Sequence, residues 1–215
     1  GGAGVCRVWE GRVVRCAGDR VTSFGGLDSG PELLGGRFNC CIEVLKKAKG
    51  RELTSMEGHC IVGKSADIVV VGGLRRSALI SLSNLSDQRM AKAKSGQWWI
   101  DEGHRALANN SVAYTEKPDF QAFLSEMQTM YESKAGERGI FSRVAAQKIA
   151  GRNGRRDNTY EFGTNPCSEI ILRSNQFCNL SEIVVRADDT LETLKAKSEV
   201  AAIIGTLQST LTDFK

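Results

Sequence analysis

Short aliphatic runs of strand length alternate with segments of helical periodicity along this chain, and this alternation limits the fold most. The run Ile68–Val71 is long enough for one buried strand, and the apolar residues between 33 and 45 recur at helical spacing. Such alternation is typical of an α/β domain. The 215 residues, 41% of them hydrophobic, suffice for one large domain or two small ones and exclude wholesale disorder.

The same patterns predict the individual elements. Thr54 and Glu57 have the spacing of a helix-capping pair, and Gly72–Gly73 separates two strand-like runs as a turn. The stretch 96–99 is expected to be irregular. The expected helices cover 31–49, 54–66, 87–94, 118–134, 144–150 and 191–214, and the expected strands cover 67–71, 77–82, 111–115, 139–141 and 177–185.

Charge and composition narrow the classes of partner. With 29 Lys and Arg against 25 Asp and Glu, the net charge of +4 allows anionic ligands, and we expect no nucleic-acid partner. No run of about 18 apolar residues predicts a membrane span. The chain starts without Met and stops inside a helical pattern, so we expect both ends to be cuts in a longer chain.

The seven cysteines form no CxxC pair, and the two histidines have no zinc-finger spacing, so the sequence predicts no metal site. An odd number of cysteines in a chain of this length favours a reduced, cytoplasmic protein over a disulfide scaffold. His59 falls on a helical pattern and is interpreted as structural. The arginines at 152, 155 and 156 form either a solvated face or a screen for phosphates.

The segment Asn165–Glu169 carries the sharpest chemical signal. Pro166 restricts the backbone before Cys167, which places the thiol on a tight loop. If that loop is locally extended, Asn165, Cys167 and Glu169 share one face and offer an amide, a sulfur and an acid–base group. A second interpretation stays open at this point, because most cysteines are inert core residues and Asn-Pro is a common turn dipeptide.

Several motifs in their order along the chain resemble the catalytic subunit of ribonucleotide reductases. The segment Asn165–Glu169 resembles the family's Asn-x-Cys-x-Glu signature, and Cys178 follows Cys167 by eleven residues. The segments 24–31, 68–82 and 108–112 are similar to further family motifs, so the likeness extends from about residue 12 to 215. The short cysteine spacing and the Gly-Gly-x-x-Ser-Gly-Pro segment look most like the adenosylcobalamin-dependent class.

The resemblance implies a thiyl-radical mechanism. Cys167 matches the cysteine whose radical removes the 3′ hydrogen of the ribose, and Glu169 matches the base that takes the 3′-hydroxyl proton. Asn165 matches the residue that hydrogen-bonds the substrate. Cys178 matches one member of the dithiol that reduces the sugar after loss of water, and no motif assigns its partner cysteine.

The resemblance also implies a loop that senses the allosteric effector and contacts the substrate base. Glycines allow such a loop to change conformation, and arginines bind phosphate or stack on a base. Without the resemblance, the same residues form a plain turn with solvated arginines. The loop residues are Gly72, Gly73, Arg75, Arg76 and Ser77, and further substrate contacts are expected at Ser29, Gly30, Pro166 and Ser168.

The resemblance implies that the fold is part of a ten-stranded α/β barrel. A central finger loop is expected at about 160–176, and residues 1–215 are expected to form one partial domain. The implied cofactor is adenosylcobalamin, bound largely outside these residues, with a dithiol reductant such as thioredoxin. The implied partners are a ribonucleotide substrate, a dNTP or ATP effector and a second copy in a homodimer.

Three other functions are compatible with the residues. A class I large subunit shares the central signature but takes its radical from a separate subunit. A non-catalytic nucleotide-binding remnant has no need of Asn165, Cys167, Glu169 and Cys178 together. A thiol redox protein using Cys167 and Cys178 lacks the CxxC spacing usual for that chemistry.

Overall fold

The computed structural model describes residues 14–20, 27–68, 70–71, 74–75, 78–154 and 156–211. The chain forms two compact units, Gly1–Ile171 and Leu172–Lys215. Within the described ranges, no helix combines the length and apolar character needed to cross a membrane.

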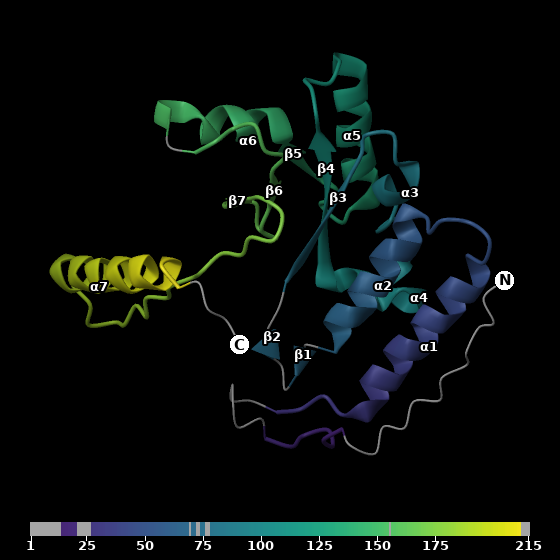
Figure 1. The fold of residues 1–215 in the computed structure, drawn as a ribbon, viewed down its shortest axis with the longest axis horizontal. Helices are drawn as coiled ribbons and strands as arrows, with labels where there is room; N and C mark the ends of the chain where they lie inside the picture. The colour runs from purple at the N-terminus through teal and green to yellow at the C-terminus, as the bar shows by residue number, and fades with distance from the viewer. Residues whose placement is uncertain are drawn as a thin grey trace. The chain divides into compact units, whose positions relative to one another are not determined.

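A parallel sheet forms the centre of the first unit (Figure 1). Its strands are β3 (Leu79–Ser83), β4 (Ala108–Tyr114) and β5 (Gly139–Ser142), with β4 in the middle. Leu79 pairs with Ala108 and Ser111 pairs with Gly139, both in parallel register. Helix α5 (Phe120–Ser133) connects β4 to β5, as a parallel crossover requires. The predicted α/β class is therefore confirmed as a mixed fold with a parallel sheet.

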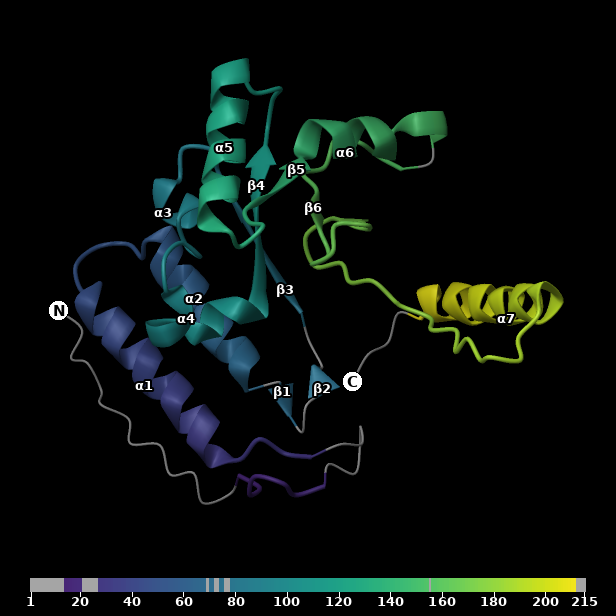
Figure 2. The ribbon, with the colours of Figure 1, turned by 180° about the vertical axis from the view of Figure 1, so that it is seen from behind.

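The remaining elements are short apart from three helices. They are α1 (Pro31–Lys47), α2 (Ser55–Asp67), β1 (Val70–Val71), β2 (Leu74–Arg75), α3 (Gln88–Ala91), α4 (Trp98–Asp101), η2 (Gly103–Leu107), α6 (Arg143–Ala150), η3 (Arg152–Gly154), β6 (Gly163–Thr164), β7 (Ile171–Leu172) and α7 (Leu191–Ser209). Both ribbon views show α1 and α2 side by side (Figures 1 and 2).

The predicted start of α2 is confirmed in detail. The Thr54 hydroxyl accepts a hydrogen bond from the Glu57 backbone N–H at 3.3 Å, and the Thr54 N–H donates to the Glu57 carboxylate at 2.8 Å. This reciprocal box satisfies two backbone donors that a helix start otherwise leaves unpaired. The helix then continues to Asp67, so the strand expected over 67–71 is reduced to Val70–Val71, which pairs antiparallel with β2.

The stretch 96–99, expected to be irregular, instead enters a helical turn at α4. Trp98 and Trp99 meet edge to face with ring centroids 6.1 Å apart. The Lys94 ammonium lies 5.6 Å from the Trp98 ring centroid. These contacts are local, because Trp99 follows Trp98 directly and Lys94 precedes Trp98 by four residues, but glycine and tryptophan composition alone did not indicate them.

A buried ion pair fastens β5 to the end of β3. The Arg138 side chain, in a residue only 2% exposed, donates to both carboxylate oxygens of Glu126 at 2.9 and 2.6 Å. Its guanidinium also donates to Ser83 Oγ and to the carbonyl of Asn84, each at 3.0 Å. A bidentate pair with its remaining donors satisfied is the arrangement that a buried charge needs.

The second unit consists of α7 and the segment that precedes it. A strand was expected over 177–185, and this prediction is wrong, because the described residues 173–190 form no strand or helix. The segment instead lies along α7 and encloses an apolar groove lined by Leu180, Val184, Val200 and Ile204 among others. A strand needs a neighbouring strand to pair with, and no described strand pairs with this segment.

Candidate active site

The segment Asn165–Ile170 forms a closed turn rather than an extended loop. The Asn165 backbone N–H donates to the Ile170 carbonyl at 3.1 Å, and the Ile170 N–H donates back to the Asn165 side-chain oxygen Oδ1 at 2.9 Å. The Ser168 N–H donates to the Asn165 carbonyl at 2.9 Å, and Ser168 has a left-handed φ of 67°. Asn165 therefore closes the turn with its backbone and its side chain together.

This geometry corrects the expected shared face. Asn165 is buried, with 6% of its surface exposed, whereas Cys167 and Glu169 are exposed. Alternation of side chains applies to extended backbone, and the left-handed residue at Ser168 breaks it. The turn thus presents a thiol and a carboxylate on its outer side and turns the amide inward.

Two apolar anchors hold the base of the turn in the core of the first unit. Phe162, fully buried, packs with Ala113 of β4, Phe141 of β5 and the alanines of α6, and Ile171 packs against the same cluster. Burying a side chain of this size contributes about 1.5–3 kcal/mol. The turn that carries Cys167 is therefore fixed at both ends.

Arg156 reinforces both anchors. Its guanidinium carbon lies 5.2 Å from the Phe162 ring centroid, and its Nη1 donates to the Ile171 carbonyl at 3.3 Å. The sequence alone indicated a solvated face or a screen for phosphates at the arginines 152, 155 and 156. Neither interpretation predicted that Arg156 holds the two anchors of the turn. Arg155 lies outside the described residues.

Strand β4 supplies a further attachment. The Asn109 side-chain Nδ2 donates to the Pro166 carbonyl at 2.8 Å, which ties the turn to the sheet. The next residue, Asn110, points to the opposite face of β4, where its Oδ1 lies 3.0 Å from Nε2 of the buried His59. Burial lowers the pKa of His59, so the ring is neutral at pH 7 and serves in packing, as predicted.

Cys178, the other predicted redox residue, belongs to the second unit. It lies half-buried in the segment before α7 and forms no disulfide, like the other described cysteines. Cys167 lies in the first unit, in a turn held by its own hydrogen bonds.

Most of the predicted effector loop lies outside the described residues. Gly72, Gly73, Arg76 and Ser77 are in this category, and for Arg75 only the backbone is described, as part of β2. The described flanks show that β1 and β2 pair antiparallel, Val71 with Leu74.

Ser29 and Gly30 lie at the start of α1. The Ser29 hydroxyl donates to the carbonyl of Ile68 at 2.9 Å, just before β1. Gly30 is buried with a φ of 81°, and a Cβ there would lie 2.9 Å from the backbone nitrogen of Ala17. Only glycine fits both this left-handed conformation and this close approach.

Sequence reasoning missed three residues that shape the site, namely Phe162, Arg156 and Asn109. Asn109 lies in the segment 108–112, one of the motifs that carry the family resemblance, and this motif could have indicated it. Nothing local in the sequence marks Phe162 or Arg156, because their contacts join segments that fold together only in space.

Comparison with known proteins decides the relationship. The chain is 32% identical over 173 residues to the adenosylcobalamin-dependent ribonucleoside-triphosphate reductase of Lacticaseibacillus paracasei. It is 33% identical over 174 residues to the enzymes of that name from Lactobacillus acidophilus and Lactobacillus leichmannii. The chain is a homologue of part of these ribonucleotide reductases. The resemblance found in the motifs, including the adenosylcobalamin-dependent class, is thereby confirmed.

The alignments cover 79% of this chain and 22–23% of each reductase. The chain therefore spans about a quarter or less of the length of these ribonucleotide reductases. No protein-family model matches the chain, and no solved structure matches it.

Proposed function

We propose that this chain forms part of the catalytic region of an adenosylcobalamin-dependent ribonucleotide reductase. The observation that carries the proposal is the turn Asn165–Ile170, which presents Cys167 and Glu169 from an anchored base. This turn lies in a chain that is homologous to such enzymes over 79% of its length. By analogy with the relatives' names, the substrate is a ribonucleoside triphosphate.

The two exposed side chains of the turn, Cys167 and Glu169, each perform one part of the first chemical step. The Cys167 sulfur, as a thiyl radical, takes the 3′ hydrogen atom of the ribose, and the Glu169 carboxylate accepts the 3′-hydroxyl proton. The 2′-hydroxyl then leaves as water with a proton that the dithiol supplies, and Glu169 later returns its proton to the 3′ oxygen. Rigid attachment of the turn matters because a misplacement of about 1 Å can cost on the order of a hundredfold in rate.

Reduction of the sugar requires a dithiol. Cys178 and a second thiol together give two electrons and two protons and become a disulfide, which a reductant such as thioredoxin returns to the dithiol. The hydrogen atom held by Cys167 returns to the 3′ carbon, so the thiyl radical is restored. Free thiols in the described part of the chain fit this chemistry and a reducing, cytoplasmic setting.

Asn165 takes a role that differs from the one implied by resemblance. Its side-chain oxygen is used inside the turn, by the Ile170 N–H. The amide is buried and faces away from the side of the turn that presents Cys167. Asn165 is therefore proposed as a positioning residue for Cys167, in place of the substrate contact that the resemblance implied.

The donor set of the turn fits the implied cofactor. Cys167 is exposed, so a large reagent can approach its sulfur while the base of the turn stays packed. Adenosylcobalamin, when bound, supplies the radical chemistry that oxidises this thiol by one electron. The residues of this chain hold the thiol and the proton acceptor in place.

The remaining parts of the proposal concern architecture and regulation. The parallel β3–β4–β5 sheet supplies strands of the ten-stranded barrel, and the segment 160–176 is its finger loop. The predicted effector loop, with Gly72, Gly73, Arg75, Arg76 and Ser77, senses a dNTP or ATP effector. The full enzyme is a homodimer. The Ser29–Ile68 hydrogen bond ties the start of α1 to the residue at the end of α2, shortly before β1.

The test uses the natural full-length protein that carries this sequence. Ribonucleoside triphosphates and diphosphates are assayed for reduction with adenosylcobalamin and a dithiol as the only additions. Turnover is expected in the wild type and in the control Cys41→Ser, and its loss is expected in Cys167→Ser. The control changes a half-buried thiol on α1, far from the turn in the sequence.

Other results identify the alternatives. Turnover that requires a separate radical-generating subunit would assign the protein to class I. Nucleotide binding without turnover would indicate a binding remnant. Activity that survives Cys167→Ser would exclude the thiyl mechanism at this residue, and a disulfide that forms readily between Cys167 and Cys178 alone would favour a thiol redox protein.

A further inference from the structure

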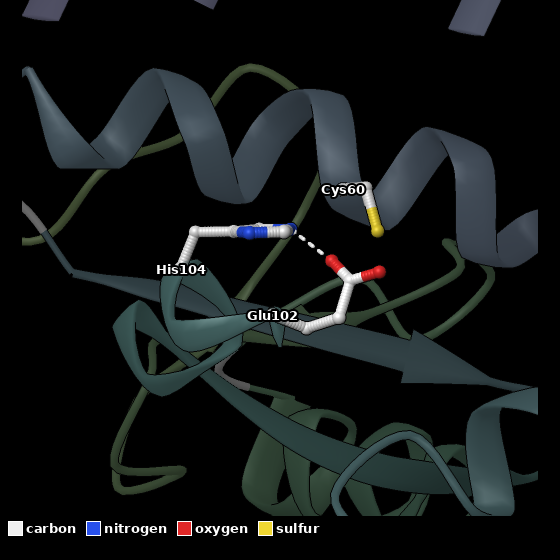
Figure 3. A group of neighbouring side chains, drawn as sticks. All are labelled: Cys60, Glu102 and His104. Carbon is white, nitrogen blue, oxygen red and sulfur yellow. Dashed lines mark ion pairs between the residues drawn. The ribbon is translucent and has the colours of Figure 1, made fainter. Parts of the chain in front are cut away.

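Three side chains of metal-ligand type meet in the first unit, away from the Cys167 turn. Cys60 comes from α2, Glu102 precedes η2, and His104 lies within η2 (Figure 3). The cysteine sulfur, a carboxylate oxygen and a ring nitrogen all lie within 4.8 Å of one another. Cys60 and His104 are 44 positions apart in the sequence, so no short motif indicates the cluster.

Gly63 allows the imidazole to approach α2. It follows Cys60 by three residues and therefore lies on the same face of the helix. A Cβ built on Gly63 would lie 3.2 Å from His104 Cδ2, which is tighter than ordinary van der Waals contact. The helix thus has a glycine where the ring lies and a thiol beside it.

The His104 ring has an unused nitrogen that is shielded from solvent. The side chain is 11% exposed, and its buried Nε2 has no hydrogen-bond partner among the described residues. The nearest acceptor, Glu102 Oε2, is 3.6 Å away, beyond hydrogen-bond distance.

Arg105 holds the outer side of the cluster. Its Nη2 lies 3.4 Å from Glu102 Oε1 and donates to Cys60 Sγ at 3.9 Å, and its Nη1 donates to the Ala93 carbonyl at 3.0 Å. One carboxylate oxygen is thus paired with arginine while the other faces the histidine. Such outer contacts orient metal ligands in protein sites.

We propose that Cys60, Glu102 and His104 form a binding site for Zn²⁺. A sulfur, a nitrogen and an oxygen suit this borderline-soft cation, whereas Mg²⁺ and Ca²⁺ require oxygen ligands. Three protein ligands leave a fourth tetrahedral position for water or another ligand. Ligand bonds of about 2.0–2.3 Å place the ligand atoms roughly 3.3–3.8 Å apart, so binding contracts the cluster by about 1 Å at its widest.

The ligand charges suit a divalent cation. A cysteine binds Zn²⁺ as a thiolate and gives up its thiol proton to solvent, so the cation would face one thiolate and one carboxylate, with the Arg105 guanidinium outside them. The ion would join α2 to η2, immediately before β4, and it takes no part in the chemistry proposed for Cys167.

The experiment uses the natural full-length protein that carries this sequence, stripped of metal with a chelator and titrated with Zn²⁺ against a chromophoric competitor. We expect one Zn²⁺ per chain, and at least a tenfold weaker affinity in Cys60→Ser, Glu102→Gln and His104→Gln. Co²⁺ replaces Zn²⁺ as a spectroscopic probe, and a sulfur-to-cobalt charge-transfer band is expected in the wild type and lost in Cys60→Ser. Cys16→Ser, at an exposed thiol outside the cluster, is the matched control and retains both signals.

Circular dichroism of each variant separates loss of the site from loss of the fold. Glu102→Gln keeps the shape of the side chain, so it decides the matter if Cys60→Ser fails to fold. The absence of stoichiometric Zn²⁺ binding by the wild type would overturn the proposal. So would a charge-transfer band that survives Cys60→Ser, or Zn²⁺ affinity that is unchanged in a folded Glu102→Gln.

Discussion

Replacing Asn165 with alanine removes the side-chain acceptor that closes the turn carrying Cys167, which Thr164 Oγ1 also approaches at 3.4 Å. The Ile170 N–H loses its acceptor, Asn165 Oδ1 at 2.9 Å, while the bond from the Asn165 N–H to the Ile170 carbonyl stays in place. Because Ile170 is half-buried, loss of this hydrogen bond costs about 0.5–1.5 kcal/mol. At about 1.4 kcal/mol per factor of ten, hydrogen exchange at the Ile170 amide should accelerate roughly 2- to 12-fold.

Amide exchange followed by NMR measures this effect at a single residue. Thr164→Val removes a hydroxyl that lies 3.1 Å from the Ile170 carbonyl and 3.4 Å from Asn165 Oδ1. It leaves the Asn165 acceptor itself in place, so the Ile170 amide should stay nearly as protected as before. Asn179→Ala changes an exposed asparagine and sets the baseline. If Asn165→Ala and Asn179→Ala give equal protection at Ile170, Asn165 does not close the turn, and the reasoning fails.

Three further changes test the surrounding framework. Arg138→Met leaves the Glu126 carboxylate buried and unpaired. The free energy of unfolding, measured in urea, should fall by about 3–5 kcal/mol. A fall of less than about 1 kcal/mol would contradict the buried pair. Gly30→Ala places a side chain at a φ of 81° and should lower the free energy of unfolding by about 1–2 kcal/mol or more. Gly36→Ala, in an open position within α1, should raise it by about 0.5–1 kcal/mol in the same assay. Arg51 holds the pKa of Glu57 down to about 2 from 4.5, so this contribution is present above about pH 4.5 and lost as the pH falls toward 2. Glu57→Gln should flatten that part of the acid-unfolding curve followed by circular dichroism, and an unchanged curve would contradict the pairing.

Local signals in the sequence predicted the helices well. The Thr54–Glu57 pair fixed the start of α2, and Asp119 caps α5 by accepting a hydrogen bond from the Ala122 N–H at 2.8 Å, at the predicted boundary. Such caps act within one turn of the chain, so their residues appear together in the sequence. The resemblance to the reductase motifs was likewise readable, because each motif is contiguous.

Features that depend on distant partners were not predictable in this way. The apolar residues of 177–185 resemble a strand by composition, yet whether they form one depends on a partner strand elsewhere. The inward position of Asn165 depends on the left-handed residue Ser168, which no alternation pattern indicates. The cluster of Cys60, Glu102 and His104 joins a helix to a later 3-10 turn and was missed for the same reason.

The connection between the Cys167 turn and β4 has a kinetic consequence. The bond that closes the turn spans five residues, whereas the bond from Asn109 to the Pro166 carbonyl spans 57. Loop closure over the longer span costs about 2 kcal/mol more in chain entropy, since that cost grows with the logarithm of length. We therefore expect the turn to form early in folding and to dock late, after the sheet has assembled. A partly folded chain would then carry a finished turn whose thiol is not yet in its working position.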